Sequence, residues 1–291
     1  MKKLLPLVII FTVALSSLAC SFTIQVPETK TGPDTTTEIN EAYPDTGVTT
    51  ELSIEMGGGS LTIGEGSGKL VEGQITTNVP TWNPEVIRSD EKVTLTQSSA
   101  DKSLTIPSGK LKNEWDLKLG TKEPIALEIK AGAYKSDITF GSVPLTDLSI
   151  EDGASQTRIV FNKPNSQVMD TFIYHTGASQ VSLINLGNAN FKEMVFESGA
   201  GSYTLDFSGQ LKQDATVDIE SGLSNMKIIV PAETNAVISL SGGVNNVSLK
   251  GTWTVDSNEY KTQSSNGPRL EININMGVGN LELISQKSNT L

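Results

Sequence analysis

The chain has 291 residues, of which 37% are apolar, 19% charged and 5% aromatic, and its formal net charge at pH 7 is −11. The chain has 22 Lys and Arg against 33 Asp and Glu, so clusters of cations are not expected. Such clusters are needed to neutralise phosphates, and their absence from the pattern argues against nucleic-acid partners and against electrostatic binding to a membrane surface. The single cysteine, Cys20, excludes an internal disulfide and a cysteine metal cluster.

The first residues have the pattern of an export signal. Two lysines precede an apolar run over residues 4–15, and small residues follow before Cys20. The run is shorter than the ~20 residues of a membrane span, so we expect residues 1–19 to be a signal peptide. The segment resembles the signal of bacterial lipoproteins, in which the cysteine after the cut carries lipid. Ser17 stands where those signals favour Leu, and with Ala19 it also suits an ordinary signal peptidase.

Residues 20–47 are rich in Thr, Pro and acids, and their apolar residues are too sparse to build an element. We expect a lipidated tether there, with a folded domain over residues 48–285. The resulting location is outside the cytoplasmic membrane or in the outer cell envelope, with membrane contact made through the lipid on Cys20.

A fourteen-residue unit organises the remaining chain. It is clearest over residues 127–140 and 148–161, where each copy reads strand, glycine turn, strand. Further copies start at Leu52, Phe172, Met194, Val217, Ile238 and Ile272. The first and third positions are apolar and the twelfth is Ile or Leu. The sixth is always glycine, namely Gly57, Gly132, Gly153, Gly177, Gly199, Gly222, Gly243 and Gly277.

The spacing of these glycines predicts a β-solenoid. From Gly132 onward the spacings are 21, 24, 22, 23, 21 and then 34 residues, and such a period is typical of stacked units that bury their apolar faces against one another. Positions 1, 3, 10, 12 and 14 should face inward. Glycine at position six is explained either by a positive φ at that residue or by a neighbouring unit that lies too close to leave room for a Cβ. Small residues at position seven favour a tightly stacked corner.

Two insertions interrupt the repeat. Residues 66–124 contain four alternating stretches, at 70–77, 85–88, 93–97 and 115–119, which predict a small antiparallel excursion capping the first unit. Residues 256–267 have the polar composition of a surface loop. We therefore predict one all-β solenoid domain with these two additions.

Several stretches resemble the bacterial toast-rack family. They are the repeated Gly-Ala-Ser-Gln at 153–156 and 177–180, Asn-Glu-Trp-Asp-Leu at 113–117, and residues 199–207. That family is related to LiaF-type envelope proteins named for the cell-wall-active antibiotic response. The likeness spans residues 49–284 and implies stacked parallel strands, with envelope-stress sensing or adhesion as the role of relatives. LiaF-type proteins also have a multi-helix membrane region that this chain lacks, so direct signalling across a membrane is not implied.

Candidate catalytic residues are few, and we expect no catalytic, cofactor-binding or metal site. His175 is the only histidine and precedes a corner glycine, where an ordinary turn residue is expected. Acids on neighbouring units suggest glycan cleavage or calcium binding as alternatives to plain solvated positions. They are Glu151, Asp152, Glu197, Asp218 and Glu220. Trp82, Trp115 and Trp253 each lie in alternating sequence and should pack.

The sequence thus predicts an envelope-anchored lipoprotein without enzymatic activity, whose solenoid binds an envelope protein or a glycan in the manner of an adhesin. The alternatives are an accessory subunit of an envelope-stress sensor and a β-helix that binds or cleaves carbohydrate.

Overall fold

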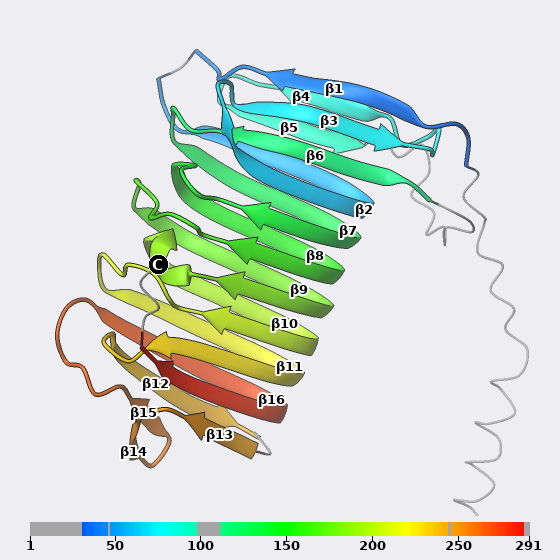
Figure 1. Ribbon diagram of the computed structural model, residues 1–291. Coiled ribbons are helices and arrows are strands. Elements are labelled where there is room, and N and C mark those ends of the chain that lie inside the picture. The colour runs from blue at the N-terminus through cyan, green and yellow to red at the C-terminus, as the bar shows by residue number, and fades with distance from the viewer. Residues whose placement is uncertain (1–30, 46, 98–110, 244–245, 288–291) are drawn as a thin grey trace, which may run out of the picture.

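The computed structural model describes residues 31–45, 47–97, 111–243 and 246–287. The predicted signal peptide and Cys20 lie outside these residues. The described chain is all-β, and its sixteen strands form one long, mostly parallel and unclosed sheet (Figure 1). One short 3-10 helix, η1 (Leu186–Ala189), lies between β9 (Met169–Ile184) and β10 (Phe191–Asp206). Within these ranges no helix is long and apolar enough to cross a bilayer.

Eight rungs of the stack each carry one copy of the fourteen-residue unit. Seven rungs are single long strands: β2 (Thr50–Ser67), β7 (Ile125–Thr139), β8 (Leu145–Val160), β9 (Met169–Ile184), β10 (Phe191–Asp206), β11 (Ala215–Pro231) and β16 (Arg269–Gln286). The eighth consists of β12 (Asn235–Gly242) and β13 (Asn246–Lys250). First positions pair in register from rung to rung, as Leu127 does with Leu52 and Leu148, which confirms the predicted repeat.

Each rung bends at its glycine. In β7, Gly132 and Ala133 are both exposed while Ala131 and Tyr134 on either side are buried, so the inward parity changes there. We call the part before the glycine arm A (positions 1–5) and the part after it arm B (positions 8–14). The arms face each other across one core.

Aromatic contacts connect the core both across the two arms of one rung and between neighbouring rungs. Within one rung, the ring centroids of Phe196 on arm A and Tyr203 on arm B are 5.3 Å apart. Between neighbouring rungs, the centroids of Tyr174 and Phe196 are 5.5 Å apart. Fully burying one such side chain contributes roughly 1.5 to 3 kcal/mol, and most of that burial depends on the next rung being present.

The first insertion covers the N-terminal end of the stack. Its predicted strands are all present, as β3 (Val71–Thr77), β4 (Pro84–Arg88), β5 (Lys92–Gln97) and β6 (Asn113–Gly120). β3 and β4 are antiparallel to their neighbours, as expected. β5 and β6, however, run parallel to arm A and arm B of β2, so together they form a further, split rung.

One strand lies inside the predicted tether. β1 (Thr35–Glu41) pairs antiparallel with β3 and its Ile39 is only 4% exposed, so the tether prediction is wrong for these residues. A run of β-branched threonines favours a strand. One inward apolar residue is enough here because β3 and β6 supply the rest of the core at this end.

At the C-terminal end, the order of the strands in the sheet differs from their order in the sequence. β16, the last strand of the chain, lies between β11 and β12, so the last two rungs are exchanged relative to the sequence. The predicted loop over 256–267 is also partly wrong: β14 (Thr254–Asp256) and β15 (Glu259–Lys261) form a hairpin, and β15 pairs with β12. Tyr260 of β15 is 9% exposed because it covers the end of the core.

Candidate functional site

The corner glycines lie in close contact along the stack. A Cβ placed on any of the seven from Gly132 onward would lie 2.3 to 2.8 Å from the carbonyl oxygen of the adjoining corner glycine. None of the eight has a positive φ. Close approach of the next rung, and not a left-handed turn, is therefore why these positions accept only glycine. At the end of the row, no atom lies within 4 Å of a Cβ placed on Gly57.

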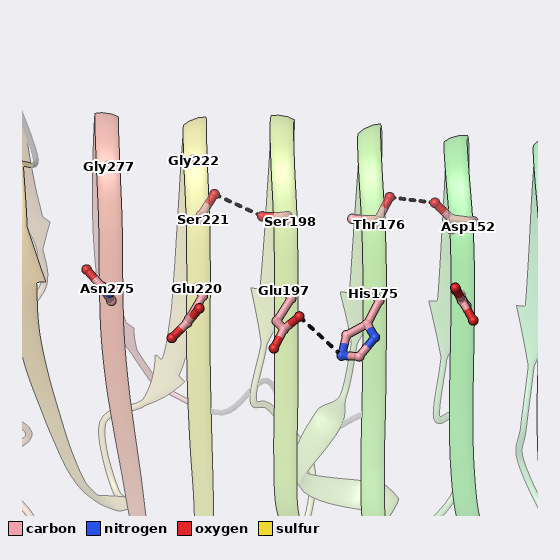
Figure 2. Close-up of a pocket in the computed structure, with 11 residues that line it drawn as sticks. Asp152, His175, Thr176, Glu197, Ser198, Glu220, Ser221, Gly222, Asn275 and Gly277 are labelled. Atoms are coloured by element: carbon pink, nitrogen blue, oxygen red, sulfur yellow. Dashed lines mark hydrogen bonds and ion pairs between the residues drawn. The ribbon is translucent and has the colours of Figure 1, made fainter.

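Next to the row of corner glycines, the side chains at the fourth position of five rungs point outward and form one row on arm A. Neighbouring members are paired in register, and Figure 2 shows His175, Glu197, Glu220 and Asn275 side by side on successive strands. Adjacent strands lie ~4.8 Å apart, so the side chains form a ladder. We call this the acidic row; its members are Glu151, His175, Glu197, Glu220 and Asn275.

A shallow depression of about 620 Å³ follows the acidic row toward the corner. The fifth positions Thr176, Ser198 and Ser221 add hydroxyl groups to its lining, and Figure 2 shows the Ser221 and Ser198 side chains hydrogen-bonded, with oxygens 2.9 Å apart. Four carboxylates and no Lys or Arg line this depression. Its chemistry suits a positively charged or hydrogen-bonding group.

His175 lies within β9 and not in a turn, contrary to expectation. Its Nε2 atom is 3.4 Å from Oε2 of Glu197, and in the strand register it lies opposite Glu151 on the other side. Both side chains of the pair are about half exposed, at 45% and 50%, so the ion pair contributes little to stability. The histidine is held among acids at the surface and has no buried catalytic partner in the described chain.

Asp152 differs from its neighbours because it points inward. It is 6% exposed and accepts hydrogen bonds from Tyr174 Oη at 2.8 Å, Thr176 Oγ1 at 2.5 Å and Ser179 Oγ at 3.3 Å. Burial, followed by the nearby Tyr134 and Asp152, raises the pKa of Tyr174 well above its usual value. We expected Asp152 to face solvent; its position five shares the parity of the inward positions one and three, and that signal could have placed it.

The acids do not gather into a metal site. Across the residues that the structure describes, no group of three or more His, Cys, Asp or Glu is arranged to hold a metal ion. The tryptophans pack to different degrees: Trp115 is 1% exposed, whereas Trp82 and Trp253 are half-buried.

The outer face of arm B is different in charge. Its ninth positions are mostly amides and hydroxyls, including Gln156, Gln180, Ser202, Asn225 and Asn280. Asn280 Nδ2 donates to Asn225 Oδ1 at 2.8 Å. Two of the cations nearby, Lys227 and Lys250, both pair with Glu282. The two outer faces of one stack thus present an acidic and a nearly neutral surface.

Comparison with known families identifies the architecture. The model described as the N-terminal domain of toast_rack, DUF2154, matches residues 29–174 and 165–229, which is more than half of the chain. The two matches overlap over residues 165–174, which include the start of β9, as expected when successive rungs resemble one another. No curated protein matches the chain.

Three solved structures are similar to this chain over most of its length. A Clostridium sporogenes protein named for a proposed role in cell adhesion is 22% identical over 87% of this chain and 99% of its own, with a TM-score of 0.48. A Bacteroides fragilis protein named as a proposed adhesin is 9% identical over 88% and 99%, with a TM-score of 0.36. A Parabacteroides distasonis protein named for proposed lipid binding is 14% identical over 88% and 98%, with a TM-score of 0.36. At these values none of them assigns a function to this chain.

Proposed function

The chain belongs to the toast-rack N-terminal domain family, and from that premise we propose that it is a non-enzymatic scaffold of the bacterial cell envelope that binds another envelope component through the acidic row. The observation that carries the proposal is the depression itself. It is lined by residues of five successive strands, of which four supply carboxylates or hydroxyls and the fifth supplies Asn275, and it lies beside a corner that has only glycine at position six.

Rigidity and charge make this surface suitable for binding. Its side chains stand on paired strands of a packed sheet, so their spacing is fixed before a partner arrives, which lowers the entropic cost of association. The acidic row carries three carboxylates against one histidine. A partner with a cationic segment would be attracted to it, and the attraction should weaken with salt.

Crosslinking in the native cells tests the proposed surface. A photo-reactive residue at position 202 or 225 on arm B serves as the reference, and one at position 275 reports on the acidic row. We expect a discrete crosslinked partner only from position 275. Changing Glu151, Glu197 and Glu220 together to Gln should reduce its yield at least tenfold, whereas changing Gln156, Gln180 and Asn225 to Ala should not. Equal crosslinking from both faces contradicts the proposal.

Anchoring through Cys20 is the second part of the proposal. The lone cysteine follows a signal-like segment, and a lipid there would hold the domain at the membrane. Cys20→Ser should move the protein from the membrane fraction to the soluble fraction, and labelled fatty acid should enter the wild type only. Absence of label from the wild type would show that an ordinary signal peptidase releases the protein.

Glycan cleavage is the competing function, because Glu197 and Glu220 are register neighbours on β10 and β11. Their strand spacing of ~4.8 Å is close to the ~5 to 5.5 Å between the carboxyl groups of retaining glycosidases. Incubating the chain from Ser21 onward with cell-wall and capsular glycans separates the two functions. Retention without new reducing ends supports binding, and product formation that Glu220→Gln abolishes supports cleavage. A crosslinked partner that belongs to a stress-sensing system would instead identify an accessory subunit.

A further inference from the structure

The twelfth position of the repeat reveals an incomplete layer at the C-terminal end. In seven rungs this inward residue is at most 1% exposed, but Leu249 on β13 is 41% exposed. The seven buried residues are Ile63, Ile138, Ile159, Leu183, Leu205, Ile228 and Leu283. All eight residues occupy the same position and are Ile or Leu, so the missing neighbour of β13 must account for the exposure of Leu249.

The two arms end at different levels. On arm A, β12 is followed by β15 and then β14. On arm B, β13 pairs only with β16 among the described strands, and no strand follows it (Figure 1). Half a rung is therefore vacant beside β15.

Apolar groups surround this vacancy. Val247 and Leu240 are only partly buried, although their equivalents inside the stack are covered, and Val255 on β14 is 49% exposed. Trp253 donates its indole N–H to the carbonyl oxygen of Lys250 at 3.1 Å, which holds the ring at the end of β13. A strand placed here would gain main-chain hydrogen bonds and would bury these side chains.

Strands at the opposite end are protected against such pairing. β4 begins with Pro84 and carries Glu85 and Arg88, while β1 carries Glu38 and Glu41. Proline and charged side chains are the usual means by which proteins block an open edge. β13 has one charge, Lys250, which is already paired with Glu282 at 2.5 Å. β13 is thus the edge best suited to accept a strand.

The chain itself contains a segment with the required pattern. Residues 22–26 read Phe-Thr-Ile-Gln-Val, with apolar side chains at 22, 24 and 26 and Pro27 next. This is the alternation of a strand with one apolar face.

That segment cannot reach the β13 of its own molecule. Gly32 donates its backbone N–H to Asn78, which fixes the chain at the N-terminal end of the stack. Nine strand spacings separate β3 from β13, or about 43 Å at the usual distance between strands. The six residues from Val26 to Thr31 span at most ~22 Å.

We propose that β13 accepts residues 22–26 of a second copy of this chain, so that copies join head to tail through a donated strand. Because the donor segment is joined to the N-terminal end of the stack through Gly32 and the acceptor lies at the C-terminal end, the interface is heterologous and each added copy presents a new vacant half-rung. The product is an open row of solenoids. The proposal is independent of the acidic row and of any lipid on Cys20.

Two complementary variants test the proposal in the chain from Ser21 onward. Ile24→Asp disables the donor and leaves the acceptor intact, whereas Leu249→Asp disables the acceptor and leaves the donor intact. In sedimentation velocity, the wild type should form a concentration-dependent series of oligomers and each variant alone should be monomeric. An equimolar mixture of the variants should form dimers and nothing larger, since only one joint is possible.

Val86→Asp on the edge strand β4 is the matched control, because Val86 is also an exposed edge residue, at 37%. It should associate as the wild type does, and thermal unfolding should show that all three variants remain folded. A wild type that stays monomeric up to its solubility limit overturns the proposal. So does association that persists in both single variants, or a mixture that remains monomeric.

Discussion

The two ends of the stack differ in how completely their terminal rungs are covered. At the N-terminal end, β5 covers arm A of the first rung and β6 covers arm B, and Trp115, Leu117 and Leu119 on β6 are at most 1% exposed. At the C-terminal end only arm A is covered, and Leu249 on arm B remains exposed. In both cases the inward residues are apolar. Their burial depends on whether a neighbour covers that arm, which is the nearest-neighbour energetics of stacked repeats.

Trp115→Ala should have the largest effect, because it removes the largest buried side chain of the N-terminal cap and the hydrogen bond from its Nε1 to Asn113 Oδ1 at 3.0 Å. We expect a loss of about 3 to 5 kcal/mol in the free energy of unfolding, measured with denaturant. Leu249→Ala at the other end should cost less than about 1 kcal/mol. Equal losses would mean that both ends are covered alike.

Corner glycines provide the next comparison, between the interior of the stack and its end. In Gly199→Ala the new Cβ would lie 2.7 Å from the carbonyl oxygen of Gly177, so two rungs must separate locally. A loss of roughly 1 to 3 kcal/mol is expected, and Gly199→Val should lose more. Gly57→Ala is the control, because its Cβ would meet no atom within 4 Å. Matching melting temperatures for the two alanine variants would refute the close-contact explanation.

A smaller effect is expected from Glu65, near the end of β2. Partial burial alone would raise its pKa, but hydrogen bonds from Ser142 and the ammonium group of Lys163 at 2.9 Å hold the pKa below its usual value of 4.5. A lowered pKa gives stability that is present above the unfolded-state value and is lost as the pH falls through the folded-state value. Glu65→Gln should therefore destabilise by less than about 1 kcal/mol at pH 7, and by less again near pH 3.

The corresponding control lies at the other end of the stack. Glu282 bridges Lys227 and Lys250 on the outer face of arm B, with its side chain 23% exposed, and its pKa is also lowered, mainly by the hydrogen bond from Lys250. Glu282→Gln should change the melting temperature less than Glu65→Gln does at neutral pH. A larger change there, or a Glu65→Gln deficit that grows in acid, would contradict the assignment.

Local pattern was enough to predict the rungs. Alternation over each arm and a glycine at a fixed position specify strand, corner and inward face, and the register Leu52–Leu127–Leu148 confirms them. The same alternation predicted the four strands of the first insertion. Each of these features is written within a short stretch of chain.

Pairing between distant stretches could not be predicted in this way. β1 and β15 contain few apolar residues, and each becomes a strand because β3 or β12 offers it an edge. The position of β16 between β11 and β12 could not be predicted either, because alternation indicates a strand but not the strands with which it pairs. At the candidate site, the acids were identified from sequence, but the inward direction of Asp152 depended on its place relative to the corner.

The exchanged order of the last two rungs bears on how the protein is made. Synthesis proceeds from the N-terminus, and domains begin to fold as they emerge. β12 and β13 leave the ribosome before β16, yet β16 is the strand that joins them to β11. Until residues 269–286 arrive, β11 has an uncovered edge that β12 can occupy in the wrong register. The eighteen-residue strand β16 is therefore needed before the last rungs of the nascent stack can pair in their native order.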